Sequence, residues 1–145
     1  MKTIACCTDF SKNADAAFNA ALDLAEKYKA RLDVIHVLSP LVNPVFPYMS
    51  VDISEENRPA LIPEIERRMQ EKYIEPAAGK AVCQPVILDG HASTEIIAYL
   101  EDNAIDLVVM GSYGLSGMGL VIFGSVAKRV AHKAPCSVMI VRNHD

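Results

Sequence analysis

Apolar residues along the chain follow two alternating patterns. Five short runs, at residues 3–8, 31–38, 81–88, 106–110 and 137–141, consist largely of apolar side chains, which is typical of strands buried in a parallel sheet. Between the first two runs, Ala14, Phe18 and Leu22 belong to a series at three- and four-residue steps with polar residues on the other face. That spacing predicts an amphipathic helix. Similar patterns predict helices near Met69 and Leu100 and over residues 125–133.

Strands that alternate with helices predict one α/β domain spanning residues 1–145. The order βαβαβαβαβ favours a doubly wound parallel sheet with helices on both faces and right-handed crossovers. Ligands in such sheets bind at the carboxyl ends of the strands. Pro85 lies inside the third strand, and a proline there favours an edge position. Residues 39–58 are too long for a simple connection and are predicted to form a surface loop or lid.

Composition narrows the class of protein further. Hydrophobic residues make up 51% of the 145, and the net charge is −4 without any cluster of Lys or Arg. These values argue against disorder and against general nucleic-acid binding. Residues 107–127 carry no charge and are long enough to cross a bilayer, but five glycines divide them into strand, loop and helix start. We therefore expect no membrane span.

The cysteines indicate the compartment. Cys6, Cys7, Cys83 and Cys136 form no Cys-x-x-Cys pair, and the first two should point to opposite faces of a strand. They are interpreted as small core residues in a reducing compartment. The first ten residues do not resemble a signal peptide, so we expect a cytoplasmic protein.

A glycine-rich loop carries the strongest functional signal. Gly111 and Gly114 are followed, after nine residues, by Gly124 and Ser125, between a predicted strand and a predicted helix. Glycine lets backbone N–H groups approach an anion, and a helix N-terminus favours negative charge, so the pattern is suited to phosphate. Glycines of this kind also occur in purely structural strand–helix connections. The spacing matches neither the dinucleotide fingerprint nor the P-loop.

This loop resembles the nucleotide-binding signature of the ATP-binding universal stress proteins. The resemblance extends over nearly the whole chain, through the segments at 8–11, 35–37, 106–111, 124–126 and 135–141. It implies the strand order 3-2-1-4-5, a homodimer, and ATP or AMP bound over the first and fourth strands. By position, Thr8, Asp9 and Val37 would line the adenine and ribose end, Met110 and Gly111 would contact ribose, and Gly114, Gly124 and Ser125 would hold phosphates. Cys7, Tyr113 and Val126 complete the nucleotide-binding set.

Alternatives remain open for individual residues. Asp9, at the end of a central strand, suits a ribose hydroxyl or an adenine amino group, but it is also a candidate helix cap. Val37 is equally suited to core packing. His36, in an apolar strand, is typical of a satisfied core histidine rather than a ligand. His91 is interpreted as a loop residue, and His132 and His144 as surface groups.

The chain departs from the family pattern at two places. Residues 115–123 carry no cation, although family members often have Lys or Arg there. A triphosphate would then depend on backbone N–H groups, the helix dipole and a divalent ion such as Mg²⁺ or Mn²⁺. Cys7 stands where the family commonly has proline.

The last strand is expected to form the dimer interface. Val138, Met139, Ile140 and Val141 include neither proline nor charge, so an exposed edge there should be covered by a second copy of the chain. The leading function is a nucleotide-binding stress-response or regulatory module that is not an enzyme. The alternatives are a slow ATPase or phosphotransferase, for which no base is evident, and a dimeric interaction module with an empty cleft.

Overall fold

The computed structural model describes residues 1–38, 58–112 and 124–143. The strands are β1 (Thr3–Cys7), β2 (Arg31–Leu38), β3 (Cys83–Asp89), β4 (Leu107–Gly111) and β5 (Ser137–Val141). The helices are α1 (Lys12–Tyr28), α2 (Arg58–Met69), the π-helix η1 (Gln70–Ile74), α3 (Glu75–Ala77), α4 (Ala92–Asp102) and α5 (Ser125–Lys133). Each strand lies within two residues of its predicted bounds.

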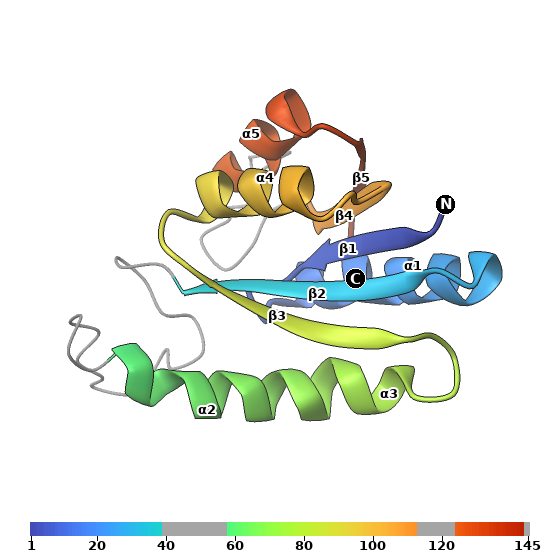
Figure 1. Ribbon diagram of the computed structural model, residues 1–145, viewed down its shortest axis with the longest axis horizontal. Helices are drawn as coiled ribbons and strands as arrows, with labels where there is room; N and C mark the ends of the chain where they lie inside the picture. The colour runs from blue at the N-terminus through green and yellow to red at the C-terminus, as the bar shows by residue number, and fades with distance from the viewer. Residues whose placement is uncertain (39–57, 113–123, 144–145) are drawn as a thin grey trace.

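The five strands form one parallel sheet. Its order is β3-β2-β1-β4-β5, as the resemblance implied (Figure 1). β3 is an edge strand, so Pro85 lies where a missing backbone donor is tolerated. β1 is central and pairs with both β2 and β4, which brings the carboxyl ends of these three strands to the same edge of the sheet.

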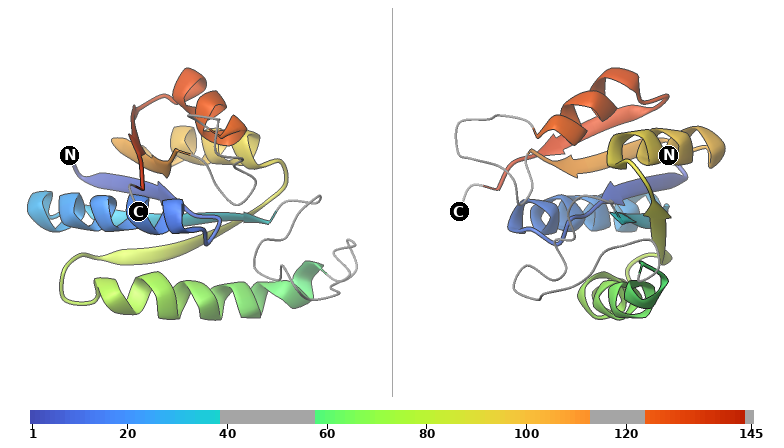
Figure 2. Two further views of the ribbon diagram at one scale, coloured as in Figure 1. Left: turned by 180° about the vertical axis from the view of Figure 1, so that it is seen from behind. Right: turned by 90° about the vertical axis from the view of Figure 1, so that its left-hand side faces the viewer.

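Two hydrophobic cores cover the two faces of the sheet. One includes Cys6 and packs under α1, α2, η1 and α3, and the other includes Cys7 and packs under α4 and α5. Figure 2 shows these helix layers on either side of the strands. The alternating direction of side chains along a strand sends adjacent cysteines into different cores, as predicted.

The helix formed by α2, η1 and α3 follows a four-residue pattern. Its buried residues recur at a constant spacing of four: Leu61, Ile65, Met69, Tyr73 and Ala77. An α-helix has 3.6 residues per turn, so this stripe would rotate away from the core by roughly 40° per step. The wider π-helix at η1 takes up one extra residue and turns Tyr73 and Ala77 back toward the sheet.

A polar cluster joins β2, β3 and α4. Asp33 is fully buried, and its carboxylate accepts from Arg31 (2.9 and 3.0 Å), the Gln84 amide (2.9 Å) and the Tyr99 hydroxyl (2.9 Å). Burial, followed by the bond to Asp33, raises the pKa of Tyr99 to about 12. The buried charge is therefore surrounded by donors, as a stable buried carboxylate requires.

The charge-free segment 107–127 is not a membrane span in its described part. It contributes β4 at one end and the start of α5 at the other. Within the described residues, no helix has both the length and the apolar character needed to cross a bilayer.

Candidate functional site

Three segments meet at the carboxyl ends of β1 and β4. Thr8 and Asp9 follow β1, Ser112 follows β4, and Gly124 precedes α5. The Ser112 amide donates to the Val141 carbonyl (3.0 Å), and the Gly124 amide donates to the Ser112 carbonyl (2.5 Å). These two bonds hold the start of α5 beside the ends of β4 and β5.

The N-terminus of α5 has the features of an anion site. Its N-cap is Gly124, in an extended conformation, and no side chain of the described residues caps the first turn. Ser125 is exposed and Val126 half-buried. Unpaired N–H groups and the helix dipole at such an end attract negative charge. Gly124, Ser125 and Val126 therefore lie where phosphate binding is physically favourable.

Gly111 has a packing role at the same edge. A Cβ on this residue would lie 2.8 Å from backbone atoms of Asn13, in the first turn of α1. Glycine is thus required for α1 to approach β4 closely. Met110, the preceding residue, is buried against the layer of α4 and α5. Packing explains the side-chain identities of both residues, and their contact with ribose stays a prediction.

The turn after β1 contains Asp9. Asp9 is half-buried, and its carboxylate accepts from the Ser11 amide (3.0 Å). The N-cap of α1 is Ser11, whose hydroxyl accepts from the Ala14 amide (3.2 Å). The reading of Asp9 as a helix cap is therefore wrong, since Asp9 shapes the turn and Ser11 performs the capping.

Thr8 is committed to contacts inside the protein. Its hydroxyl contacts the Tyr73 hydroxyl (2.5 Å) and accepts from the Phe10 amide (2.9 Å). Its amide donates to Ile35, and its carbonyl lies 3.0 Å from His36 Nδ1. Each polar group of Thr8 thus already has a partner, so Thr8 shapes the site rather than offering a free donor.

His36 is a core histidine with one unsatisfied nitrogen. A carbonyl can only accept, so Nδ1 carries the proton donated to Thr8. Nε2 is buried and has no hydrogen-bond partner in the described part of the chain. Burial lowers the pKa of His36, so the neutral ring is favoured. The expected core role is confirmed, but among the described residues the ring lacks the second partner that full satisfaction requires.

The remaining predicted site residues divide into two groups. Val37 and Cys7 pack with the core under α4 and α5, and burial raises the pKa of the Cys7 thiol to about 12. That thiol is therefore protonated and inert at neutral pH. Tyr113 and Gly114 lie outside the described residues, as does the loop predicted at 39–58 except for Arg58, which begins α2. No group of three or more potential metal ligands occurs in the described segments.

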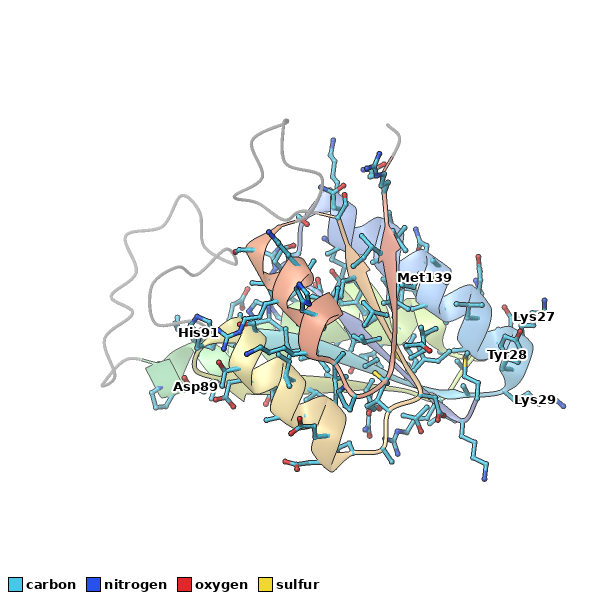
Figure 3. All side chains as sticks on the ribbon, turned by 90° about the horizontal axis from the view of Figure 1, so that it is seen from above. Lys27, Tyr28, Lys29, Asp89, His91 and Met139 are labelled. Carbon is cyan, nitrogen blue, oxygen red and sulfur yellow. The ribbon has the colours of Figure 1, made fainter. Side chains whose placement is uncertain are left out.

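Sequence reasoning missed two residues beneath the site. Tyr73 and Lys72, both in η1, contact Thr8 and the Phe10 carbonyl respectively. The four-residue spacing of buried positions was a signal for Tyr73, because it places this tyrosine on the core face of the helix. His91, interpreted as a loop residue, is the exposed residue just before α4 (Figure 3). His132 is exposed, as expected.

Comparison with known proteins places this geometry in a family. The profile of the universal stress protein family matches residues 1–142. The universal stress protein YxiE of Bacillus subtilis is 28% identical over 92% of this chain and 94% of its own length. A universal stress protein of Thermus aquaticus is 31% identical over 97% of this chain and 98% of its own length.

Solved structures agree on the fold. Universal stress protein UspA from Lactobacillus plantarum superimposes with a TM-score of 0.78, at 25% identity and 97% coverage of each chain. A universal stress protein in complex with cAMP gives a TM-score of 0.69, at 22% identity over 97% of this chain and 96% of its own. One from Archaeoglobus fulgidus in complex with dAMP gives 0.66, at 18% identity and the same coverages. With the family profile spanning almost the entire sequence, these matches show that the chain belongs to the universal stress protein family.

Proposed function

We propose that this chain binds an adenine nucleotide at the carboxyl ends of β1 and β4. The observation that carries the proposal is the start of α5 beside the end of β4, where Gly124 is the N-cap and no side chain of residues 1–38, 58–112 or 124–143 caps the first turn. Phosphate would bind at these N–H groups, and the nucleoside would extend toward Asp9. Relatives of the same fold in complex with cAMP and dAMP support adenine as the base.

The nucleotide acts as a regulatory ligand rather than a substrate that turns over rapidly. Phosphoryl transfer needs a group that positions water, a metal-binding carboxylate and cationic support for the transition state. Asp9 is the carboxylate that the described part of the site offers. The proposed role is therefore that of a cytoplasmic stress-response module, and a turnover assay should detect at most slow ATP hydrolysis.

The first experiment asks whether nucleotide binds, and where. Mass spectrometry of the purified, denatured protein should detect a copurified adenine nucleotide, and calorimetry should measure the affinities of adenosine, AMP and ATP. Gly124→Leu should abolish ATP binding without unfolding the protein, because the φ of −65° at this position is open to any residue. Ala131→Leu adds the same side chain at an exposed position later in α5 and should bind ATP normally.

Two outcomes of this experiment would contradict the proposal. If Gly124→Leu binds ATP as tightly as the parent, the phosphate site is elsewhere. If neither copurification nor calorimetry detects an adenine nucleotide, the function is wrong. Calorimetry with a chelator tests the role of a divalent ion. ATP affinity should fall without Mg²⁺ or Mn²⁺, because residues 115–123 carry no cation, whereas adenosine affinity should not change.

A further inference from the structure

The turn that carries Asp9 is held in an unusual conformation. Phe10 has a φ of 64°, in the left-handed region that bulky side chains avoid. Its ring is nonetheless buried and lies 4.8 Å from the His36 ring, with the Arg68 guanidinium 5.2 Å from its centroid. Such a conformation persists only where the surroundings hold it, and it is characteristic of functional turns.

Tyr73, in the π-helix η1, makes one of the contacts that stabilise this turn. The bonds form a chain with a definite direction: the Phe10 amide donates to the Thr8 hydroxyl (2.9 Å), and the Tyr73 hydroxyl donates to the Asp15 carboxylate (3.2 Å). The remaining proton, on Thr8, is therefore donated to the Tyr73 oxygen, 2.5 Å away. Removing the tyrosine oxygen would leave the buried Thr8 proton without its acceptor.

Lys72, the preceding residue, supplies a second hold. Its ammonium donates to the Phe10 carbonyl (3.2 Å) and pairs with Asp15 (3.0 Å). Two consecutive residues of one helix thus reach the residues before and after Asp9, and both also contact α1 through Asp15. The extra residue of the π-helix sets this orientation, because a continuous α-helix would rotate these side chains by roughly 100°.

We propose that Tyr73 and Lys72 are positioning residues that fix Asp9 for the nucleoside end of the ligand. This inference rests on the proposed function. It adds a specific expectation: since the phosphates bind at α5, loosening the turn after β1 weakens adenosine, AMP and ATP by the same factor. A substitution at the N-terminus of α5 should instead lower the affinity more for a ligand with more phosphates.

The test compares Tyr73→Phe with Tyr99→Phe. Both variants remove a hydroxyl from a hydrogen bond with a side chain, but Tyr99 bonds to Asp33 and packs in the core under α4 and α5, away from the turn. Tyr73→Phe should weaken all three ligands by about fivefold, the factor expected for one hydrogen bond of about 1 kcal/mol. Tyr99→Phe should leave the three affinities unchanged. Equal binding by both variants, or a loss confined to ATP, overturns the proposal.

Hydrogen exchange separates this proposal from the proposed function. In the ligand-free protein, the Phe10 amide is protected by the Thr8 hydroxyl, so its exchange should accelerate in Tyr73→Phe and not in Tyr99→Phe. Lys72→Met, which removes the contact with the Phe10 carbonyl, should have the same effect. If the parent binds no nucleotide but the Phe10 amide responds, the proposed function is wrong, and Tyr73 and Lys72 still hold the turn, without a role in nucleoside binding. If the amide does not respond in either η1 variant, the positioning fails whatever the ligand.

Discussion

At the scale of single residues, His36 makes the stability of the fold depend on pH. Its pKa is lowered from 6.5 by burial, and its surroundings are the Thr8 carbonyl, the Phe10 ring and two charges of opposite sign, Asp9 and Arg68. The unfolded chain therefore binds a proton that the folded chain resists. Stability is complete above about pH 6.5 and declines as the pH falls toward the lower folded value.

We expect His36→Asn to flatten this decline. The asparagine amide can still donate to the Thr8 carbonyl from about the position of Nδ1, but it does not titrate. Urea unfolding between pH 7 and pH 5 should show a smaller loss of stability in the variant than in the parent. His132→Asn, at an exposed position on α5, is the control and should follow the parent. Parallel pH profiles for the parent and His36→Asn would exclude His36 as the cause.

Residue roles were harder to predict than residue positions. Asp9, Gly111 and Gly124 lie at one edge of the sheet, as strand-end reasoning requires. The sequence did not reveal that Ser11 rather than Asp9 caps α1, or that Gly111 is required by the approach of Asn13. Both roles depend on short-range contacts in three dimensions, and the order of residues along the sequence does not specify that geometry.

At the scale of elements, the Asp33 cluster connects three parts of the fold that are distant in sequence. Asp33→Ala would leave Arg31, Gln84 and Tyr99 without their acceptor. We expect the free energy of unfolding to fall by about 2 kcal/mol, because the substitution removes hydrogen bonds from partly buried donors to a fully buried carboxylate. Urea titration measures this change.

A matched control separates burial from charge in this prediction. Glu64→Ala removes a carboxylate from the exposed ion pair with Arg67 on α2, where solvent replaces the lost contact. Its effect on unfolding should be much smaller. Similar losses from both substitutions would show that the Asp33 cluster does not stabilise the protein through burial.

The elements were predictable to different degrees. Continuous apolar runs marked all five strands, because a sheet covered on both faces buries every side chain along its central strands. The helix from α2 to α3 was recognised only in part. A spacing of four residues matches neither the 3.6-residue period of an α-helix nor the two-residue period of a strand. The π-helix that keeps Tyr73 on the core face was therefore not anticipated. A constant spacing of four over five buried residues is itself a usable signal for such an insertion.

At the scale of the whole molecule, β5 is an edge of the sheet. Its outer side pairs with no other described strand, and Met139 on this strand is 37% exposed (Figure 3). An uncovered apolar edge favours pairing between copies of the chain. We therefore propose, as the family resemblance implies, that Val138, Met139, Ile140 and Val141 pair with the same residues of a second copy around a twofold axis.

Ile140→Pro tests this assembly. The Val141 carbonyl accepts from Ser112 on the β4 side, and backbone groups alternate sides along a strand, so the Ile140 N–H faces the open edge. Proline removes this donor, so dimerisation should weaken, and light scattering at micromolar concentration should detect a lower mass. Ile140→Val keeps the donor and favours a strand, so it should remain dimeric. A monomeric parent, or a folded Ile140→Pro variant that remains fully dimeric, would contradict the interface.

The adjacent cysteines of β1 have a practical consequence. Burial raises the pKa of both thiols, and each belongs to a different core, so a thiol reagent reaches Cys6 only when the layer of α1 and α2 opens and Cys7 only when that of α4 and α5 opens. The reaction rates of two adjacent residues therefore report the opening of the two helix layers separately. Pulsed alkylation read by fragmentation mass spectrometry would time the opening of each layer in the unaltered chain, and would reveal whether a bound nucleotide slows one side of the sheet more than the other.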